Sequence, residues 1–116
     1  MSDAMNAACD LANKRCKPCE GGMPPLSQPE ADNLMKQLAG WQRFDHLIGK
    51  TYHFKDYYQT IAFVNAVAWM AHRENHHPEL TVTGNTCHVE YTTHAIHGLS
   101  ENDFICAAKV DTLFRI

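Results

Sequence analysis

The chain has 116 residues, which is enough for one compact domain. Hydrophobic residues make up 45% of it and charged residues 20%, as is typical of a folded protein with a buried core. The formal net charge of -3 lacks the basic excess of proteins that grip DNA, and the longest apolar run, residues 66–71, is far shorter than the roughly 20 residues that span a bilayer. We therefore expect a cytoplasmic protein with no membrane span and no direct contact with nucleic acid.

The first 25 residues have no hydrophobic periodicity and contain Gly-Gly and Pro-Pro pairs, so residues 1–25 are predicted to form a flexible arm. The folded domain is expected over residues 26–116. Ser27 and Glu30 have the spacing of a capping box, which predicts the start of a helix. The apolar residues that follow repeat at the spacing of one helical face before Gly40: Ala31, Leu34, Met35 and Leu38.

A hairpin and a long helix are predicted next. Residues 41–54 are rich in aromatic and β-branched side chains, which predicts a β-hairpin with its reversal at residues 45–46. Asp56 and Gln59 have the spacing of a helix cap, and the helix that they start cannot continue through Pro78. Apolar groups surround this helix on nearly every side, which indicates a surface that another subunit covers.

A second hairpin and a terminal helix complete the chain. Residues 80–91 alternate in polarity around Gly84 and Asn85, which predicts a two-residue type II′ turn. Ser100 and Asp103 have the spacing of another capping box, and apolar residues line the helix that follows. The resulting order αββαββα predicts an α+β fold, with a four-stranded antiparallel sheet and three helices packed on one face.

A group of histidines at the end of the long helix is the densest candidate for acid–base chemistry. His76 and His77 stand between Asn75 and Pro78, and His94 follows the second hairpin. Because imidazole titrates near neutral pH, these side chains can give and take protons in one pocket. The alternative is that they are solvated or cap helix carbonyls. Asp103 already has a structural use in the capping box, which does not exclude a second use in catalysis.

Metal and redox sites are the competing hypotheses. His72 and His76 are four residues apart, so on one helical face they would supply two metal ligands, with His88 or His94 as a third. Glutamate does not follow His72, so the zinc-protease motif is absent. Residues 16–19 form a lone CxxC within the predicted arm, where reduced cysteines are favoured over a zinc or redox site.

Three stretches resemble the pterin-4a-carbinolamine dehydratase family, in its bacterial form with a dimerisation-cofactor-like fold. They are Glu74–Glu79, Thr92–His94 and Gly98–Asp103, and the resemblance extends over about residues 27–116. The leader, with its CxxC followed by Gly-Gly and Pro-Pro-Leu, is also similar to that of bacterial members. The resemblance implies a four-stranded antiparallel sheet with three helices on one side, assembled as a homodimer or homotetramer.

Family members dehydrate 4a-hydroxytetrahydropterin, which aromatic amino acid hydroxylases produce, to quinonoid dihydropterin and water. They use no metal and no organic cofactor, so none is expected here. By this resemblance His76 and His94 are the acid–base pair, and His77 is a further active-site residue that binds and orients the pterin. The implied substrate-binding residues are His77, Asp103, Asn75 and Glu79.

The resemblance leaves several points open. Asp103 matches a family acid, which implies that it orients His94 or accepts a hydrogen bond from the pterin. Asn75 and Asn102 stand where many members have aspartate and a basic residue, which affects the surroundings of the site and the preference for a pterin side chain. Animal relatives also serve as dimerisation cofactors of a homeodomain transcription factor, and some relatives are linked with molybdopterin metabolism. The alternatives are thus a non-catalytic partner of a hydroxylase or regulator, and a molybdopterin-related role.

Overall fold

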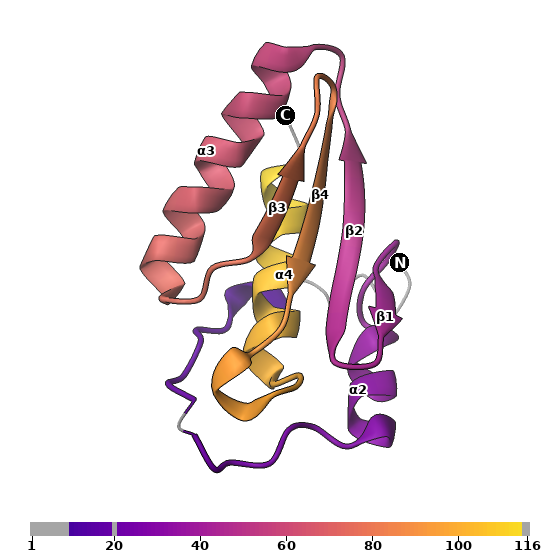
Figure 1. Cartoon of the computed structure of the whole chain (residues 1–116), viewed down its shortest axis with the longest axis vertical. Helices are drawn as coiled ribbons and strands as arrows, with labels where there is room; N and C mark the ends of the chain where they lie inside the picture. Colours follow the sequence, from indigo (N-terminus) through magenta and orange to yellow (C-terminus); the bar gives the residue numbers. More distant parts are fainter. Residues whose placement is uncertain (1–9, 20, 115–116) are drawn as a thin grey trace.

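The computed structural model describes residues 10–19 and 21–114 (Figure 1). Its elements in chain order are α2 (Gln28–Met35), β1 (Gln42–Phe44), β2 (Leu47–His53), α3 (Tyr57–Glu74), β3 (Glu79–Val82), β4 (Thr86–Tyr91), the short 3-10 helix η1 (His94–Ile96) and α4 (Glu101–Leu113). Residues 10–13 form one further helical turn. None of the described helices is long and apolar enough to cross a membrane.

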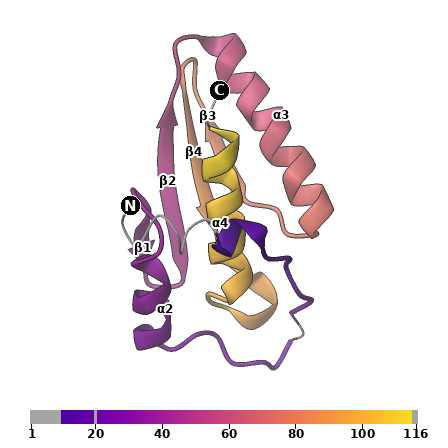
Figure 2. The same cartoon turned by 180° about the vertical axis from the view of Figure 1, so that it is seen from behind.

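The four strands form one antiparallel sheet in the order β1-β2-β4-β3. In the two central strands, Ile48 lies opposite Tyr91 and Tyr52 lies opposite Cys87. Figures 1 and 2 show α2, α3 and α4 gathered on one side of this sheet. The predicted αββαββα order and the α+β fold class are confirmed.

The core lies between the sheet and the helices, because side chains along a strand alternate between its two faces. Ile48, Tyr52 and Val89 point to the helix-covered side, and all three are buried. The opposite face carries polar groups, and there Oγ1 of Thr51 lies 2.7 Å from Nδ1 of His88. One face of the sheet therefore packs in the core, and the other face is polar.

Helix α4 is the central helix of this layer. Every residue in its stretch 102–108 is buried. Helix α3 instead buries a single stripe, formed by Thr60, Phe63, Val67 and Ala71. It leaves Tyr58 81% exposed and Trp69 64% exposed. The stretch 102–108 of α4 is therefore fixed by packing on all sides, whereas α3 keeps an aromatic outer surface.

The helices begin where the sequence predicts. The capping box at Ser27 and the cap at Asp56 are both present. In the box of α4, the backbone N–H of Ser100 donates to Oδ2 of Asp103 at 2.9 Å. These caps fix the helix starts because they satisfy N–H groups that have no partner within the helix.

The turn of the second hairpin differs from the predicted type. Residues 84–85 connect the strands as expected, and Thr83 N donates to the Thr86 carbonyl at 2.9 Å. Gly84, however, does not have the positive φ that a type II′ turn requires. Its carbonyl accepts a hydrogen bond from the Thr60 hydroxyl of α3 at 3.3 Å. Contact with a neighbouring helix therefore contributes to the turn geometry, and a local pattern does not contain that contact.

The described part of the predicted arm is packed against the domain. Leu11 is 1% exposed and belongs to the core. Leu26 N donates to the Leu99 carbonyl at 2.8 Å, and a Cβ atom at Gly98 would lie only 2.7 Å from Cβ of Pro25. The sequence does not reveal this packing, because a single buried apolar side chain creates no periodicity. The remainder of the predicted arm, residues 1–9 and 20, lies outside the described residues.

Replacing Leu11 tests whether this segment belongs to the folded unit. Leu11→Ala is expected to lower the free energy of unfolding by about 2–4 kcal/mol, because it removes buried contacts and leaves a cavity. Denaturation in urea measures the change. Met23→Ala is the control, since Met23 is 50% exposed and its truncation should change stability by less than about 0.5 kcal/mol. Equal effects of the two substitutions would contradict the packing of the segment.

Candidate active site

The end of helix α3 determines where His76 lies. The helix stops because Asn75 adopts the left-handed conformation, with φ of 53°, and His76 N then donates back to the Ala71 carbonyl at 3.1 Å. Pro78 keeps His77 out of a helical conformation, so the chain continues directly into β3. The two neighbouring histidines therefore leave the helix on an irregular turn, which gives them different surroundings.

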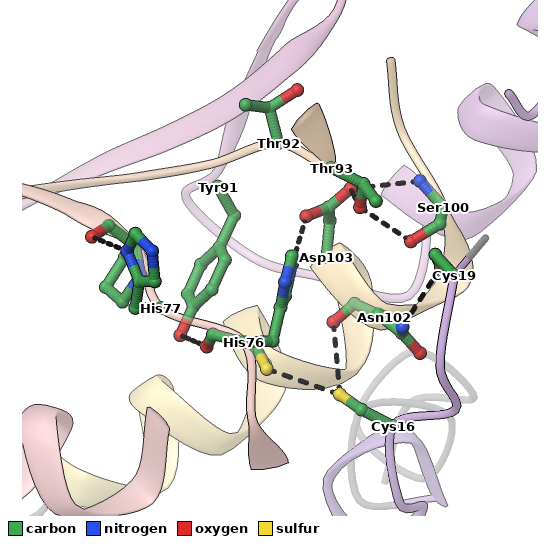
Figure 3. Close-up of polar contacts among 12 residues, drawn as sticks. Cys16, Cys19, His76, His77, Tyr91, Thr92, Thr93, Ser100, Asn102 and Asp103 are labelled. Atoms are coloured by element: carbon green, nitrogen blue, oxygen red, sulfur yellow. Dashed lines mark hydrogen bonds and ion pairs between the residues drawn. The ribbon is translucent and has the colours of Figure 1, made fainter. Parts of the chain in front are cut away.

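His76 is held by a buried carboxylate. Its Nε2 lies 2.6 Å from Oδ1 of Asp103 (Figure 3). Asp103 is fully buried, and its Oδ2 accepts hydrogen bonds from the Thr93 hydroxyl at 2.8 Å and from Ser100 N at 2.9 Å. A carboxylate with this many donors has little freedom to rotate. It therefore fixes the orientation of the His76 ring and favours a proton on Nε2.

The surroundings of His76 also set its charge. Its ring stacks on Tyr91 with the ring centroids 5.2 Å apart. Burial alone lowers the pKa of His76, but the hydrogen bond to Asp103 and the negative charge of that carboxylate outweigh burial. The pKa of His76 is therefore raised above its usual value of 6.5. As a result, His76 is able to donate a proton near neutral pH.

A cavity of about 500 Å³ opens beside His76. Four parts of the chain line it: the end of α3 and the turn after it with His76 and His77, the segment after β4 with His94, residues 16–19, and Asn102 of α4. Its size is within the range of small-molecule binding sites. The structure thus brings the three predicted histidines to the border of one cavity.

The other predicted residues take different positions. Asn75 lines the cavity, and both His77 and His94 are exposed. Glu79 lines a smaller neighbouring cavity of about 30 Å³, together with His77 and His94. Asp103 is buried and hydrogen-bonds His76, whereas the resemblance implied that it orients His94 or contacts the pterin. Its contact with His76 depends on how α4 crosses the end of α3, which the sequence pattern does not contain.

The structure does not place His72 and His76 as the metal hypothesis requires. His72 belongs to α3, but His76 follows the end of the helix, so the two do not share a helical face. The His72 ring packs against Trp69 instead, with the ring centroids 5.5 Å apart. His88 lies on the polar face of the sheet. Within the described ranges, no group of three or more His, Cys, Asp or Glu side chains is placed to hold a metal ion.

The sequence assigns no role to residues 16–19, which the structure places at the cavity. Sγ of Cys16 lies 3.5 Å from Sγ of Cys106 in α4, and Sγ of Cys19 accepts a hydrogen bond from the Asn102 amide at 3.3 Å (Figure 3). The two cysteines of the CxxC thus contact α4 separately. No sequence signal could reveal this placement, because the contact partners stand 83 to 90 positions later in the chain.

The fold and this site together define a small α+β protein with three histidines at the border of one cavity. A model of the family described as pterin 4 alpha carbinolamine dehydratase matches residues 24–113. The chain belongs to this family, and the resemblance stated from the sequence is confirmed.

Relatives of known sequence or structure agree with this assignment. The chain is 69% identical to a provisionally named pterin-4-alpha-carbinolamine dehydratase of Nitrosospira multiformis. The alignment of 107 residues covers 92% of this chain and 95% of the relative. It is 62% identical to a protein of the same provisional name from Nitrosomonas europaea. That alignment of 112 residues covers 96% of this chain and 99% of the relative.

Two solved structures are similar in fold. The transcriptional coactivator/pterin dehydratase of Brucella melitensis has a TM-score of 0.74 at 28% identity, over 77% of this chain and 97% of that chain. A pterin dehydratase-like protein, described as a RuBisCO assembly factor in the alpha-carboxysome, has a TM-score of 0.55 at 24% identity. The match covers 65% of this chain and 87% of that chain. The second likeness shows the fold alone.

The charge of His76 can be tested through Asp103. In wild type, an NMR titration of the His76 ring should give a pKa above 6.5, whereas Asp103→Asn should bring it below that value because burial persists without the carboxylate charge. The raised pKa also means that protonated His76 stabilises the fold at pH below about 6.5, and that this contribution is lost as the pH rises through the folded-state pKa.

Asp32→Asn, at an exposed position on α2, is the matched control and should leave the His76 titration unchanged. Identical His76 titrations in wild type and Asp103→Asn would contradict the electrostatic role of Asp103.

Proposed function

We propose that this protein dehydrates 4a-hydroxytetrahydrobiopterin, the pterin-4a-carbinolamine, to quinonoid dihydropterin and water. The observation that carries the proposal is the protonatable His76, held by the buried Asp103 at a cavity that His77 and His94 also line. Membership of the family supports the class of substrate. The reaction recycles the pterin cofactor of aromatic amino acid hydroxylases, and the proposed location is the cytoplasm.

The reaction needs two proton movements and no change of oxidation state. The bond between C4a and its hydroxyl oxygen breaks as that oxygen gains a proton and leaves as water, and the N5 proton is removed as the C4a=N5 double bond forms. Groups with a pKa near 7 serve both steps efficiently. Because Nε2 of His76 faces Asp103, the proton that His76 exchanges with the substrate is the one on Nδ1.

The other cavity residues complete the proposed site. His94 is the second member of the acid–base pair, and His77 binds and orients the pterin ring. Asn75 contributes hydrogen bonds from the same lining. Glu79 lies at the neighbouring cavity that His77 and His94 share with it, so it acts at the margin of the bound pterin. Asp103 acts through His76, since it is fully buried.

The outer surface of α3 supports association with another chain. Tyr58 and Trp69 are strongly exposed there, and isolated soluble proteins rarely leave extended apolar patches uncovered. We propose a homodimer or homotetramer that covers this surface. A hydroxylase or a transcriptional regulator is the alternative partner, and the Brucella melitensis relative is described as a transcriptional coactivator as well as a pterin dehydratase.

The catalytic proposal predicts the effect of removing each histidine. His76→Ala and His94→Ala should each slow dehydration by at least about 100-fold, because each removes one proton-transfer group. The measurement is the absorbance decay of enzymatically generated 4a-hydroxytetrahydropterin, with the spontaneous rate subtracted.

His53→Ala is the matched control. His53 is exposed at the end of β2 and does not line the cavity, so this variant should keep the wild-type rate. Circular dichroism checks that each variant is folded. A wild-type protein that leaves the spontaneous rate unchanged would overturn the catalytic proposal, and the non-catalytic partner role would then be the function to test.

A further inference from the structure

Residues 16–19, here called the N-terminal wall, form one side of the cavity that the histidines line. Lys17, Pro18 and both cysteines of this wall border the cavity, and the wall itself belongs to no helix or strand. A segment without secondary structure keeps such a position only if specific contacts hold it.

The side chain of Asn102 holds the wall from α4. Its Oδ1 accepts a hydrogen bond from Lys17 N at 3.0 Å, and its Nδ2 donates to the Lys17 carbonyl at 2.5 Å. Asn102 is only 8% exposed, and it uses both ends of its amide on the backbone of one residue. Two opposed hydrogen bonds fix both the position and the direction of that peptide segment.

Glu74 holds the wall from α3. Its Oε1 accepts a hydrogen bond from Cys16 N at 2.8 Å, and its side chain is 6% exposed. Arg15 and Lys109 approach Oε2 at 3.0 and 3.9 Å and balance its charge. Glu74 stands two positions before His76, as Asn102 stands one before Asp103. The wall is therefore held by residues that stand one and two positions before the members of the histidine–carboxylate pair.

The chemistry of the substrate places its C6 substituent close to the reacting atoms. The histidines must reach N5 and the hydroxyl on C4a, and C6 is bonded directly to N5, so the substituent on C6 lies beside them. Lys17 and Arg73 both line the cavity, and neither has an ion-pair partner within residues 10–19 and 21–114. Ammonium and guanidinium groups are donors that suit hydroxyl oxygens.

We propose that the N-terminal wall contacts the C6 substituent of the bound pterin through Lys17, and that Asn102 is the positioning residue that holds this contact in place. The inference rests on the proposed function and extends it to substrate preference. The protein should therefore distinguish a pterin with a dihydroxypropyl chain at C6 from one with only a methyl group there.

The test compares two substrates, the 4a-carbinolamines of tetrahydrobiopterin and of 6-methyltetrahydropterin. Asn102→Ala and Lys17→Ala should each raise KM for the first substrate roughly three- to tenfold, the factor expected for one or two lost hydrogen bonds, and leave kcat within about twofold. KM for the methyl substrate should change less than about twofold. Asn33→Ala and Lys36→Ala, at exposed positions on or beside α2, are the matched controls.

Binding of 7,8-dihydrobiopterin and 6-methyl-7,8-dihydropterin, followed by fluorescence quenching, separates this inference from the catalytic proposal. If Asn102→Ala and Lys17→Ala both bind dihydrobiopterin more weakly and bind the methyl ligand unchanged, the contact between the N-terminal wall and the C6 substituent is supported, even if wild type proves inactive. Equal weakening for both ligands, or none for either, overturns it. Lys17→Ala keeps the test decisive if Asn102→Ala fails to fold, because Lys17 is exposed.

Discussion

The contact between His76 and Asp103 is the interaction on which the site depends, because one carboxylate serves two structures. Its Oδ2 closes the capping box at Ser100, and its Oδ1 holds the imidazole. Asp103 lies in the stretch 102–108 of α4, in which every residue is buried, so Asp103 cannot shift without disturbing the core. The orientation and charge of His76 are thus set by the packing of the domain, although His76 itself lies on an irregular turn.

The sequence carries much of this fold because its signals are local. Caps at Ser27 and Asp56, together with alternating polarity along the hairpins, place helices and strands without knowledge of the tertiary structure. The histidines are recognisable for the same reason, since they lie next to element ends. The partner of Asp103 is not recognisable, because the contact spans 27 positions and depends on where α4 meets the end of α3. The conformation of Gly84 likewise reflects a contact with another helix.

The N-terminal segment shows the limit of local signals more clearly. Leu11 and the two cysteines of the CxxC give no periodicity, so their sequence resembles that of an arm. What fixes this segment is a set of polar contacts to backbone and side-chain atoms far along the chain, chiefly through Asn102 and Glu74. Both anchors look like ordinary surface positions in the sequence. Their role is visible only when α3 and α4 lie side by side.

The long sequence separation of these contacts has a consequence for folding. The strand pair β3–β4 closes around a two-residue turn, but the hydrogen bond from Lys17 to Asn102 closes a loop of 85 positions. Contacts between distant residues form slowly because loop closure must precede them. We therefore expect the cavity to be completed late in folding, after the sheet and α4 have formed. Because only side-chain anchors hold residues 16–17, the amides bound by Asn102 and Glu74 should exchange with solvent sooner than those of the β4 ladder.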